Sequence, residues 1–461
     1  MLQVQPEQMP QQYPLPKPRN QIRPVLPIFG SQTPISMLQA AYIAQNRDAV
    51  VAGLQKKNFK DTDKVDQIIT IDEKRRKVKF DLDELLSQQN SIAKEIGQLF
   101  AQGKRDEADA LKGKAPLLKE QSRELQEQLE ALELEQYELL VTLPNLPHSS
   151  VPAGKTPEEN EVVKQVGTIP TMASTAKPHW ELLEQFGIVD LALGTKITGA
   201  GFPVYLGKGA RLQRALVNFF LDEAIAAGYK EVNPPLMVNT DTAFGTGQLP
   251  DKEGQMYHAT EDNYYLIPTA EVPVTNIHRD DILAEGDLPI RYCAYSPCFR
   301  REAGSYGKDV RGLNRVHQFE KVEIVQFQTP EKSYETLEGM VSHVERILQK
   351  LELPYRILRL CGGDMSFSSA LTYDFEVYSA AQQRWLEVSS VSNFETFQSN
   401  RMKIRYKGNE DKKTQLVHTL NGSALALPRI VAALLENNQT AEGTVLLPKV
   451  LHSYTGFEVI G

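Results

Sequence analysis

The sequence predicts an α+β protein in which an antiparallel β-sheet domain, flanked by helices, follows an antiparallel pair of long helices. Apolar residues recur every seven positions in two successive segments of the N-terminal third. β-rich runs cluster in the remaining two thirds, without the regular strand–helix alternation of a doubly wound parallel sheet. No GxxxxGK[ST] or GxGxxG pattern follows a predicted strand, so the two common nucleotide-binding fingerprints are absent.

The size and composition of the chain limit its function classes. Its 461 residues suffice for two or three domains, and 41% hydrophobic with 24% charged residues is ordinary for a globular protein. Because the formal net charge is −8, a nucleic-acid partner would need local basic patches. Cys293, Cys298 and Cys361 form no CxxC pair, so we expect buried thiols in a reducing compartment. No apolar run could span a membrane, and we expect a cytoplasmic protein without a membrane partner.

The N-terminal extension, residues 1–36, is rich in proline and glutamine and shows no periodicity. Such a segment buries too little apolar surface to fold, so we expect it to be disordered. It has neither the apolar core of a secretion signal nor the Arg/Ser-rich composition of a transit peptide. An alternative is that translation begins at Met37.

Two heptad segments predict a helical domain over residues 37–150 with a coiled-coil arm over about 74–141. The first set of apolar positions is Val78, Leu85, Ile92 and Leu99, with Leu82 and Ile96 interleaved. The second is Leu111, Leu118, Leu125, Leu132 and Leu139, with Ala115 and Leu129 interleaved. The short glycine-containing tip AQGKRDEAD joins them into an antiparallel hairpin, and Pro116 should bend or start the second helix.

Two functions fit this arm, and its residues alone leave both open. A heptad hairpin can dimerise. It can also contact an extended polyanion through basic residues, although interleaved glutamates weaken this interpretation. The basic residues are those of EKRRKVK at 73–79 and, farther out, Lys104, Arg105, Lys112, Lys114, Lys119 and Arg123.

A Pro-rich polar linker, residues 142–161, leads into a second domain that we place at 151–461. Within it, the segment FRREAGSYGKDVRGLNRVHQFEKVE at 299–323 reads as strand, loop, strand. Its arginines offer forked donors for phosphate or carboxylate. Glu323 shares a strand face with Phe319 and Val325, so it needs a partner. The segment is either a clamp on a substrate that is anionic at one end and aminated at the other, or an internal ion-pair network.

Two further stretches contain candidate binding groups. In LIPTAEVPV, Thr269 and Glu271 lie two residues apart, where they could hold an ammonium group or simply face solvent. HTLNGSALALPRIVAALLENNQ, 418–439, predicts a strand, a polar turn and an apolar helix with Pro428 in its first turn. Arg429 then lies at a helix start, which disfavours a cation unless an anion or an aromatic face is near.

These stretches resemble the three motifs of class II aminoacyl-tRNA synthetases, and closely those of the seryl-tRNA synthetase family in its bacterial-type form. Motif one is GYKEVNPPLMV at 228–238, motif two is 299–323 and motif three is 418–439. The TAE triplet and WLEVSSVSNFETFQSNR at 385–401 belong to the same pattern. The resemblance runs from about Met37 to the C-terminus. No cysteine set matches the active-site zinc of the archaeal-type form, so we expect no zinc.

The resemblance implies a six- to seven-stranded antiparallel sheet carrying the active site, and an arm that binds tRNA. It implies that L-serine and ATP, with Mg²⁺, give seryl-adenylate, and that serine then passes to tRNA(Ser) and also to tRNA(Sec). It also implies a homodimer formed through motif one.

The resemblance also implies a role for individual residues. Arg300 would bridge the serine carboxylate and the ATP α-phosphate, and Arg429 would contact adenine or the γ-phosphate. Glu302 would bind the adenine amino group, and Phe319 would stack on the base. The catalytic residues would be Arg300, Glu387 and Arg429. The serine site would comprise Thr269, Ala270, Glu271, Arg300, Glu323, Asn421 and Ser423. The ATP site would comprise Arg300, Arg301, Glu302, Val316, Phe319, Glu387, Val388, Ser389, Ser390 and Arg429. Mg²⁺ would be held by Glu387 and Ser390.

Some groups near the motifs keep a second interpretation. Arg301, Arg311 and Arg315 are either contacts to the small substrates, anchors of the loop or contacts to the acceptor end of tRNA, and His317 reads as structural. One rival to the family reading is a class II relative that activates another amino acid or charges a carrier protein. A second is a catalytically dead homologue that acts as a binding module. The presence of Arg300, Glu387 and Arg429 argues against the second rival.

Overall fold

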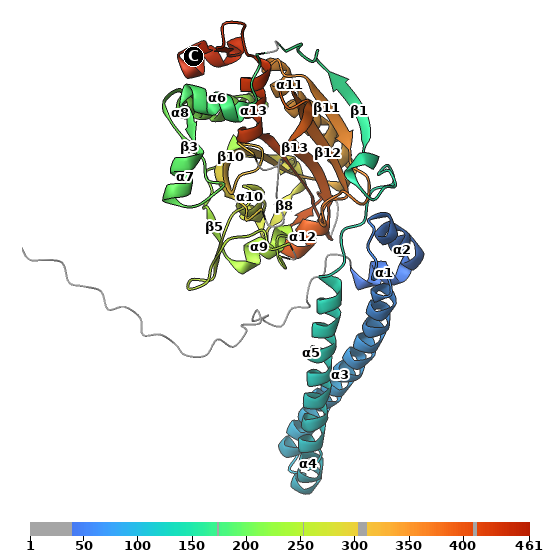
Figure 1. Ribbon diagram of the computed structural model, residues 1–461. Helices are drawn as coiled ribbons and strands as arrows, with labels where there is room; N and C mark the ends of the chain where they lie inside the picture. The colour runs from blue at the N-terminus through green and yellow to red at the C-terminus, as the bar shows by residue number, and fades with distance from the viewer. Residues whose placement is uncertain (1–38, 173–174, 252, 303–310, 409–412) are drawn as a thin grey trace, which may run out of the picture. The chain divides into compact units, whose positions relative to one another are not determined.

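The computed structural model describes residues 39–172, 175–251, 253–302, 311–408 and 413–461, which lie in one compact unit that begins at Ile35 (Figure 1). The expected disorder of residues 1–36 lies outside the described residues. So does the middle of the motif-two loop, residues 303–310.

The N-terminal elements form the predicted helical hairpin (Figure 1). They are α1 (Ala40–Gln45), α2 (Arg47–Lys56), α3 (Lys64–Ala101), α4 (Arg105–Lys112) and α5 (Ala115–Leu140). Helix α3 begins at Lys64, well before the predicted start near residue 74, and the predicted tip loop contains the short helix α4. Pro116 lies in the first turn of α5, where its missing N–H leaves no helical hydrogen bond unmade, so it starts the helix without bending it.

The seam between α3 and α5 combines heptad side chains with polar contacts. Leu82 and Leu129 are buried and most other heptad positions are half-buried, as expected for two helices open to solvent on both sides. Ala115 is exposed at the start of α5 and does not contribute to the seam. Gln89 Nε2 donates across the hairpin to the Leu118 carbonyl at 2.6 Å, and Gln136 Nε2 donates to Asp72 Oδ1 at 3.2 Å.

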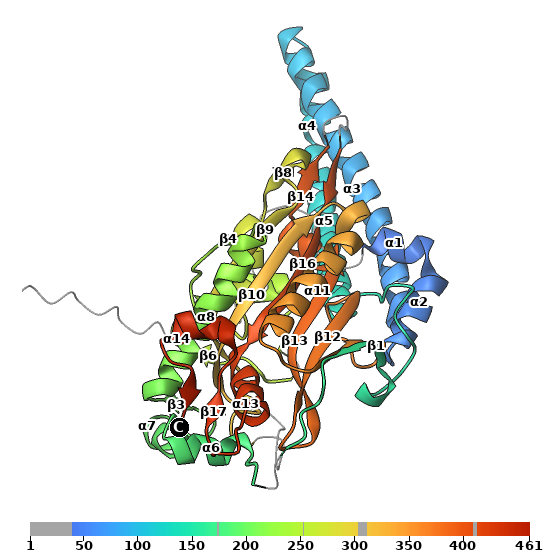
Figure 2. The same ribbon diagram turned by 90° about the horizontal axis from the view of Figure 1, so that it is seen from above.

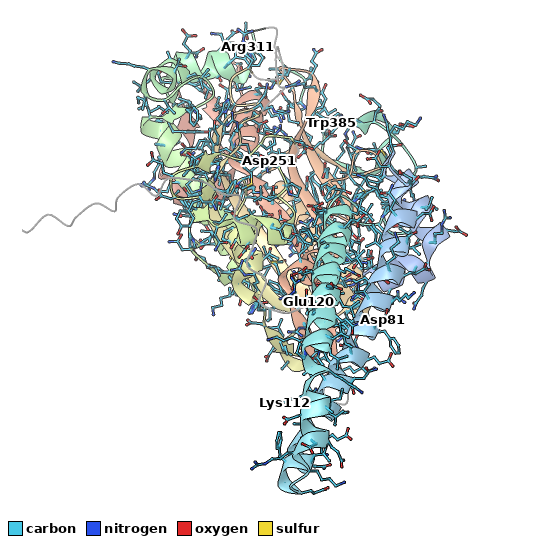
Figure 3. All side chains as sticks on the ribbon, turned by 90° about the horizontal axis from the view of Figure 1, so that it is seen from below. Asp81, Lys112, Glu120, Asp251, Arg311 and Trp385 are labelled. Atoms are coloured by element: carbon cyan, nitrogen blue, oxygen red, sulfur yellow. The ribbon has the colours of Figure 1, made fainter. Side chains whose placement is uncertain are left out.

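Several cations predicted to contact phosphate are engaged within the arm. The buried Asp72 accepts from both Arg75 and Arg76 at the base of α3. Farther out, Arg123 pairs with Glu120 and Glu127. Figure 3 shows acidic and basic side chains together along the arm, with Glu120 on α5 and Lys112 closer to the tip. Near the tip, Lys104 also pairs with Glu107 at 3.5 Å. Arg105, Lys112 and Lys114, which form no ion pair within the described residues, are therefore the better phosphate candidates.

The second domain is built on an eight-stranded sheet of order β1-β11-β12-β13-β16-β10-β9-β4. All neighbouring pairs are antiparallel except β4 with β9, which confirms the antiparallel prediction. The six to seven strands expected are too few, because β1 and the two-residue β4 extend the edges. The strands are β1 (Glu161–Val166), β4 (Lys230–Glu231), β9 (Ile290–Phe299), β10 (Gln318–Gln328), β11 (Tyr355–Arg359), β12 (Leu371–Ser379), β13 (Arg384–Glu395) and β16 (His418–Ala426).

One face of this sheet carries the main hydrophobic core. Helices α8 (Gly207–Ala226), α11 (Ser333–Lys350) and α13 (Leu427–Asn437) cover it, and Figure 2 shows α8 and α11 in front of the strands. Val322 and Ile324 of β10 point into this core, so Glu323 between them points to the opposite face. That opposite face is partly covered by α10 (Glu271–Thr275) and α12 (Phe397–Met402).

Shorter elements complete the domain. The helices are α6 (His179–Phe186), α7 (Leu191–Ile197), α9 (Thr240–Thr246) and α14 (His452–Thr455). The strands are β2 (Val189–Asp190), β3 (Val204–Tyr205), β5 (Met237–Val238), β6 (His258–Ala259), β7 (Tyr264–Leu266), β8 (Ile282–Ala284), β14 (Arg405–Lys407), β15 (Thr414–Leu416), β17 (Val445–Leu446) and β18 (Val459–Ile460). The three cysteines are buried free thiols, as predicted. In the part of the chain that the structure describes, no helix has the length and apolar character needed to cross a bilayer.

Candidate active site

A cavity of about 720 Å³ lies against the sheet face that carries Glu323. Nearly all the predicted site residues line it, although they come from distant parts of the sequence. Ala270 is fully buried behind the surface, and Arg301 lies outside with its guanidinium 5.9 Å from the Tyr257 ring. The predicted residues that line the cavity are Thr269, Glu271, Arg300, Glu302, Val316, Phe319, Glu323, Glu387, Val388, Ser389, Ser390, Asn421, Ser423 and Arg429.

Strand register explains why these residues meet. Glu323 of β10 lies opposite Ser423 of β16. Residues opposite each other in an antiparallel ladder share a face. In β12 and β13, Asp374 lies opposite Ser390 in the same way. The sheet thus presents hydroxyl and carboxylate groups from four strands on one surface.

A β-bulge in β13 places Glu387 on this surface. Glu387 and Ser390 are three residues apart, so in a regular strand they would point to opposite faces. The ladder pairs Phe375 with Ser389 and Glu376 with Glu387, which leaves Val388 as an extra residue. This shift turns Glu387 to the same face as Ser390.

At one end of the cavity, Glu323 is 2% exposed and held by two donors. Thr269 Oγ1 donates to its carboxylate at 3.0 Å, and Lys321 forms an ion pair with it. Lys321 Nζ also donates to Thr269 Oγ1 at 2.7 Å. Sequence analysis missed Lys321, although its position two residues before Glu323 on one strand was a usable signal. The ion pair between Lys321 and Glu323 shows that segment 299–323 contains an internal ion pair, which was one of its two interpretations.

Glu271 forms a second buried carboxylate at the same end. Burial, with the negative charge of Glu323, raises the pKa of Glu271 to about 7. Gln398 Nε2 of α12 donates to it at 2.7 Å. Sequence analysis assigned no role to Gln398, since nothing in the sequence shows that α12 reaches α10. The negative charge of Glu323 that acts on Glu271 favours binding of a cation beside them.

Arg300 follows directly after β9. Its N–H donates to the His317 carbonyl at 2.9 Å, and its guanidinium lies 5.2 Å from the Phe319 ring. Arg300 has no ion-pair partner among the described residues, whereas Arg315 pairs with Glu302. The ion-pair interpretation therefore applies to Arg315, and Arg300 keeps its charge available to a ligand.

Arg429 begins the motif-three helix α13, where the dipole disfavours it. Its Nε donates to the Asn314 carbonyl at 2.9 Å, and its Nη1 donates to the Glu387 carbonyl at 2.6 Å. We expected an anion or an aromatic face beside Arg429. Two carbonyl oxygens instead supply the partial negative charge. They also fix the guanidinium at the cavity wall.

Two neighbours of the motifs have anchoring contacts. The Arg311 guanidinium lies 4.6 Å from the Trp180 ring, which supports its interpretation as a loop anchor. His317 Nδ1 contacts the Tyr257 hydroxyl at 2.8 Å and its ring stacks on Phe202, as expected of a structural histidine.

The other end of the cavity contains an incompletely compensated acid pair, Asp374 and Glu387. Burial and the charge of Glu387 raise the pKa of Asp374 well above its usual range, and Ser390 donates a hydrogen bond to it. Asp374 Oδ1 has no hydrogen-bond partner. Within the described ranges, no group of three or more histidine, cysteine or acidic side chains is arranged to hold a metal ion. Sequence analysis missed Asp374, which read only as part of a strand.

Comparison with known proteins assigns both domains. Residues 37–147 match the model of the seryl-tRNA synthetase N-terminal domain, and residues 255–438 match the tRNA synthetase class II core domain (G, H, P, S and T). A serine–tRNA ligase of Salinibacter ruber is 53% identical over 92% of this chain and 99% of its own length. A serine–tRNA ligase of Chlorobaculum parvum is 49% identical over 92% and 100%. The chain is therefore a class II aminoacyl-tRNA synthetase.

Solved structures agree with this assignment. A Pyrococcus horikoshii seryl-tRNA synthetase complexed with ATP is 36% identical, with a TM-score of 0.86, over 92% of this chain and 99% of that one. A Naegleria fowleri cytoplasmic serine–tRNA ligase in complex with AMP is 27% identical, with a TM-score of 0.81, over 93% and 98%. The chain belongs to the seryl-tRNA synthetase family.

Proposed function

We propose that this protein activates L-serine with ATP and transfers serine to tRNA(Ser). The observation that supports this most directly is that one cavity is lined by two buried carboxylates and by Arg300, which has no ion-pair partner among the described residues. Glu271 and Glu323 suit an ammonium group and a hydroxyl, while Arg300 suits a carboxylate and a phosphate. Serine and ATP together present these four groups.

Specificity for serine would come from Thr269, Glu271 and Glu323. An amino acid without a hydroxyl would leave buried acceptors of this pocket unpaired, and such a loss rejects analogues strongly. Asn421 and Ser423 would shape the pocket from β16. Alanine is therefore expected to be a very poor substrate.

In the first reaction, a serine carboxylate oxygen attacks the α-phosphorus of ATP, the bond to the β-phosphate oxygen breaks, and pyrophosphate leaves. Arg300 would align both reactants and stabilise the charge that builds on the α-phosphate oxygens. In the second reaction, a ribose hydroxyl of the terminal tRNA adenosine attacks the seryl carbonyl and AMP leaves. No covalent bond to the enzyme is needed in either step.

Mg²⁺ would be held by Glu387 and Ser390, with Asp374 as a further oxygen donor. The unpartnered Oδ1 of Asp374 and the raised pKa fit a hard cation that prefers oxygen ligands. When bound, the ion would neutralise charge on the ATP phosphates. Arg429 and Phe319 would hold the nucleotide from the two faces of its base.

The arm is the proposed tRNA contact, through the outer basic residues. The homodimer and the charging of tRNA(Sec) stay predictions. Motif one places α8 and the exposed strand β4 at the proposed dimer contact. Light scattering would report a mass close to twice 51.8 kDa for a dimer and close to 51.8 kDa for a monomer.

The decisive experiment is amino-acid-dependent ATP–pyrophosphate exchange without tRNA, comparing serine with threonine, alanine, glycine, cysteine and proline. Exchange with serine alone is expected. Exchange with another amino acid would keep the fold and overturn the specificity. A folded protein that exchanges with none of them, with Mg²⁺ supplied, would be a binding module.

A shortened arm separates the two reactions. The contacts of Gln89 with Leu118 and of Gln136 with Asp72 place Asp83 and Leu125 at about the same level of the hairpin. Residues 84–124 can therefore be replaced by a Gly-Ser linker while the base of the arm stays intact. Exchange should be retained and charging of tRNA should fall about a hundredfold or more, because the phosphate contacts are lost. Normal charging by this variant would remove the arm from the tRNA site.

A further inference from the structure

A buried polar network lies behind the cavity wall. His179 of α6 and Glu436 of α13 are both 0% exposed, and neither lines the cavity. His179 Nδ1 lies 2.7 Å from Glu436 Oε1, which also accepts from the His179 backbone N–H at 2.9 Å. Glu436 further accepts from Gln382 Nε2 at 3.0 Å and from the Ser379 hydroxyl. A buried carboxylate with this many donors is a rigid anchor.

The second ring nitrogen of His179 contacts the return segment of motif two. The Leu313 N–H donates to His179 Nε2 at 2.9 Å. Nε2 must therefore be the unprotonated nitrogen, and Nδ1 carries the hydrogen that is donated to Glu436. The imidazole thus links α13 to one particular backbone N–H of the active-site loop.

The backbone at this contact is shaped for the imidazole. Gly312 has a φ of +67°, and a Cβ there would lie 2.2 Å from His179 Nε2. Only glycine allows both this conformation and this approach. The glycine of the sequence VRGLN is therefore required by the histidine that it faces.

Helix α13 holds the same loop at two places. Arg429 donates to the Asn314 carbonyl, and the Asn314 side chain donates to Gln382 Oε1 at 2.9 Å. Arg429 and Glu436 are seven residues apart, about two helical turns, so both project from one side of α13. Arg429 holds Asn314 directly, and Glu436 holds the loop through His179 and Gln382.

We propose that His179 and Glu436 form a positioning pair for ATP binding. They fix the backbone of residues 313–316, which lines the cavity, and thereby the carbonyl that orients Arg429. The inference rests on the proposed function, because it concerns the affinity of that site for ATP. Neither side chain touches the substrate, and both act through the loop.

Two substitutions of one residue test the pair. In His179→Gln, the amide oxygen can take the place of Nε2 and accept from Leu313. In His179→Asn, the side chain can still reach Glu436 but is too short for Leu313. In pyrophosphate exchange, His179→Asn should raise the KM for ATP about tenfold, as expected for one unpaired buried N–H, and leave the KM for serine within about twofold. His179→Gln should restore most of the loss.

His343→Asn is the matched control. His343 is 3% exposed on α11, where its Nδ1 lies 3.5 Å from Arg346 Nη2. This variant should lose thermal stability without a change in either KM. An unchanged KM for ATP in His179→Asn, an equal rise in both KM values, or equal impairment in His179→Gln would overturn the proposal.

A second variant keeps the test open if His179→Asn does not fold. Gln382→Ala removes the other link to Asn314 from a partly exposed turn and should raise the KM for ATP about threefold; no change would overturn the proposal. Exchange by the unaltered protein reports separately on the proposed function. If that protein showed none, the ATP dissociation constants of the same variants would decide for or against the pair.

Discussion

The two ends of the cavity treat negative charge differently. At the serine end, Glu271 and Glu323 receive a lysine, a hydroxyl and an amide from the protein itself. At the other end, the buried Asp374 beside Glu387 receives one hydrogen bond from Ser390, and no basic side chain of the described residues lies within ion-pair distance. The first end is largely assembled before any ligand arrives. We propose that a substrate and its metal ion complete the second.

This difference indicates that the choice of amino acid and the binding of the ATP phosphates depend on different parts of the cavity. A preassembled pocket can reject a wrong amino acid through groups that are already in place. A phosphate and metal site can stay open because its charge balance comes with the nucleotide. Substitutions at the two ends should therefore change different kinetic constants.

The largest expected effect comes from Arg300, which we propose contacts both the serine carboxylate and the α-phosphate. Arg300→Ala should lower pyrophosphate exchange about a thousandfold, since it removes the unpaired cation placed for the reacting carboxylate and α-phosphate. Arg359→Ala, which breaks a pair with Glu161 at the sheet edge, is the control and should stay within twofold. A loss below tenfold in Arg300→Ala would give the bridging role to another residue.

Replacing one carboxylate at each end of the cavity tests the difference between the two ends most directly. Glu323→Gln should raise the KM for serine about a hundredfold and leave the Mg²⁺ requirement unchanged, because the neutral amide loses the buried ion pair with Lys321 and replaces one of the two acceptor oxygens with a donor. Glu387→Gln should raise the Mg²⁺ concentration for half-maximal exchange about tenfold and leave the KM for serine unchanged. If both variants altered the same constant, the division of the cavity would be wrong.

The serine end should also depend on pH near neutrality. With a pKa of about 7, Glu271 is about one-tenth ionised at pH 6 and mostly ionised at pH 8. The ionised form attracts the ammonium group, so the KM for serine should be up to about tenfold higher at pH 6 than at pH 8. Glu271→Gln should show a flat profile over this range. A profile in the variant as steep as in the unaltered protein would exclude Glu271 as its cause.

The smallest effect concerns stability without ligands. The folded-state pKa of Asp374 is raised, so the folded protein binds more protons than the unfolded chain, and the free energy of unfolding falls as pH rises above about 4. Asp374→Asn removes this loss. Its melting temperature relative to the unaltered protein should therefore rise between pH 5 and pH 7.5, by about 2 °C. If the difference in melting temperature between the variant and the unaltered protein stayed constant with pH, Asp374 would be ionised in both the folded and the unfolded state. The titration of Glu271 contributes to both proteins and therefore largely cancels in this difference.

Sequence reasoning succeeded where the determinants are local. The heptads of Val78 to Leu139 predict α3 and α5 because a seven-residue period is a pattern within one continuous segment of the chain. Strand order could not be predicted, since β1 pairs with β11 across nearly 200 residues and no local pattern encodes that choice. The motif residues of the site were placed by resemblance, and their roles stay predictions.

The residues that sequence reasoning missed share one physical property. Lys321, Asp374, Gln398 and His179 each contact a side chain from a distant segment, and these contacts exist only in the folded chain. Lys321 had in addition a local signal, since Glu323 lies two residues farther along the same strand. An isolated buried histidine or lysine reads as ordinary core or surface. Burial next to a second polar group is what marks each of them, and burial is a property of the fold.

The extra residue at Val388 has a consequence for how this sequence can change over time. Glu387 shares a face with Ser390 only because Val388 is left out of the ladder. If Val388 were drawn into regular pairing, Glu387 would turn toward the helix-covered core, although no functional residue had been replaced. Loss of Val388 together with the bulge would instead leave Glu387 two residues from Ser390 and on the same face. The facing of this carboxylate therefore depends on an irregularity of the backbone as much as on the identity of the residue.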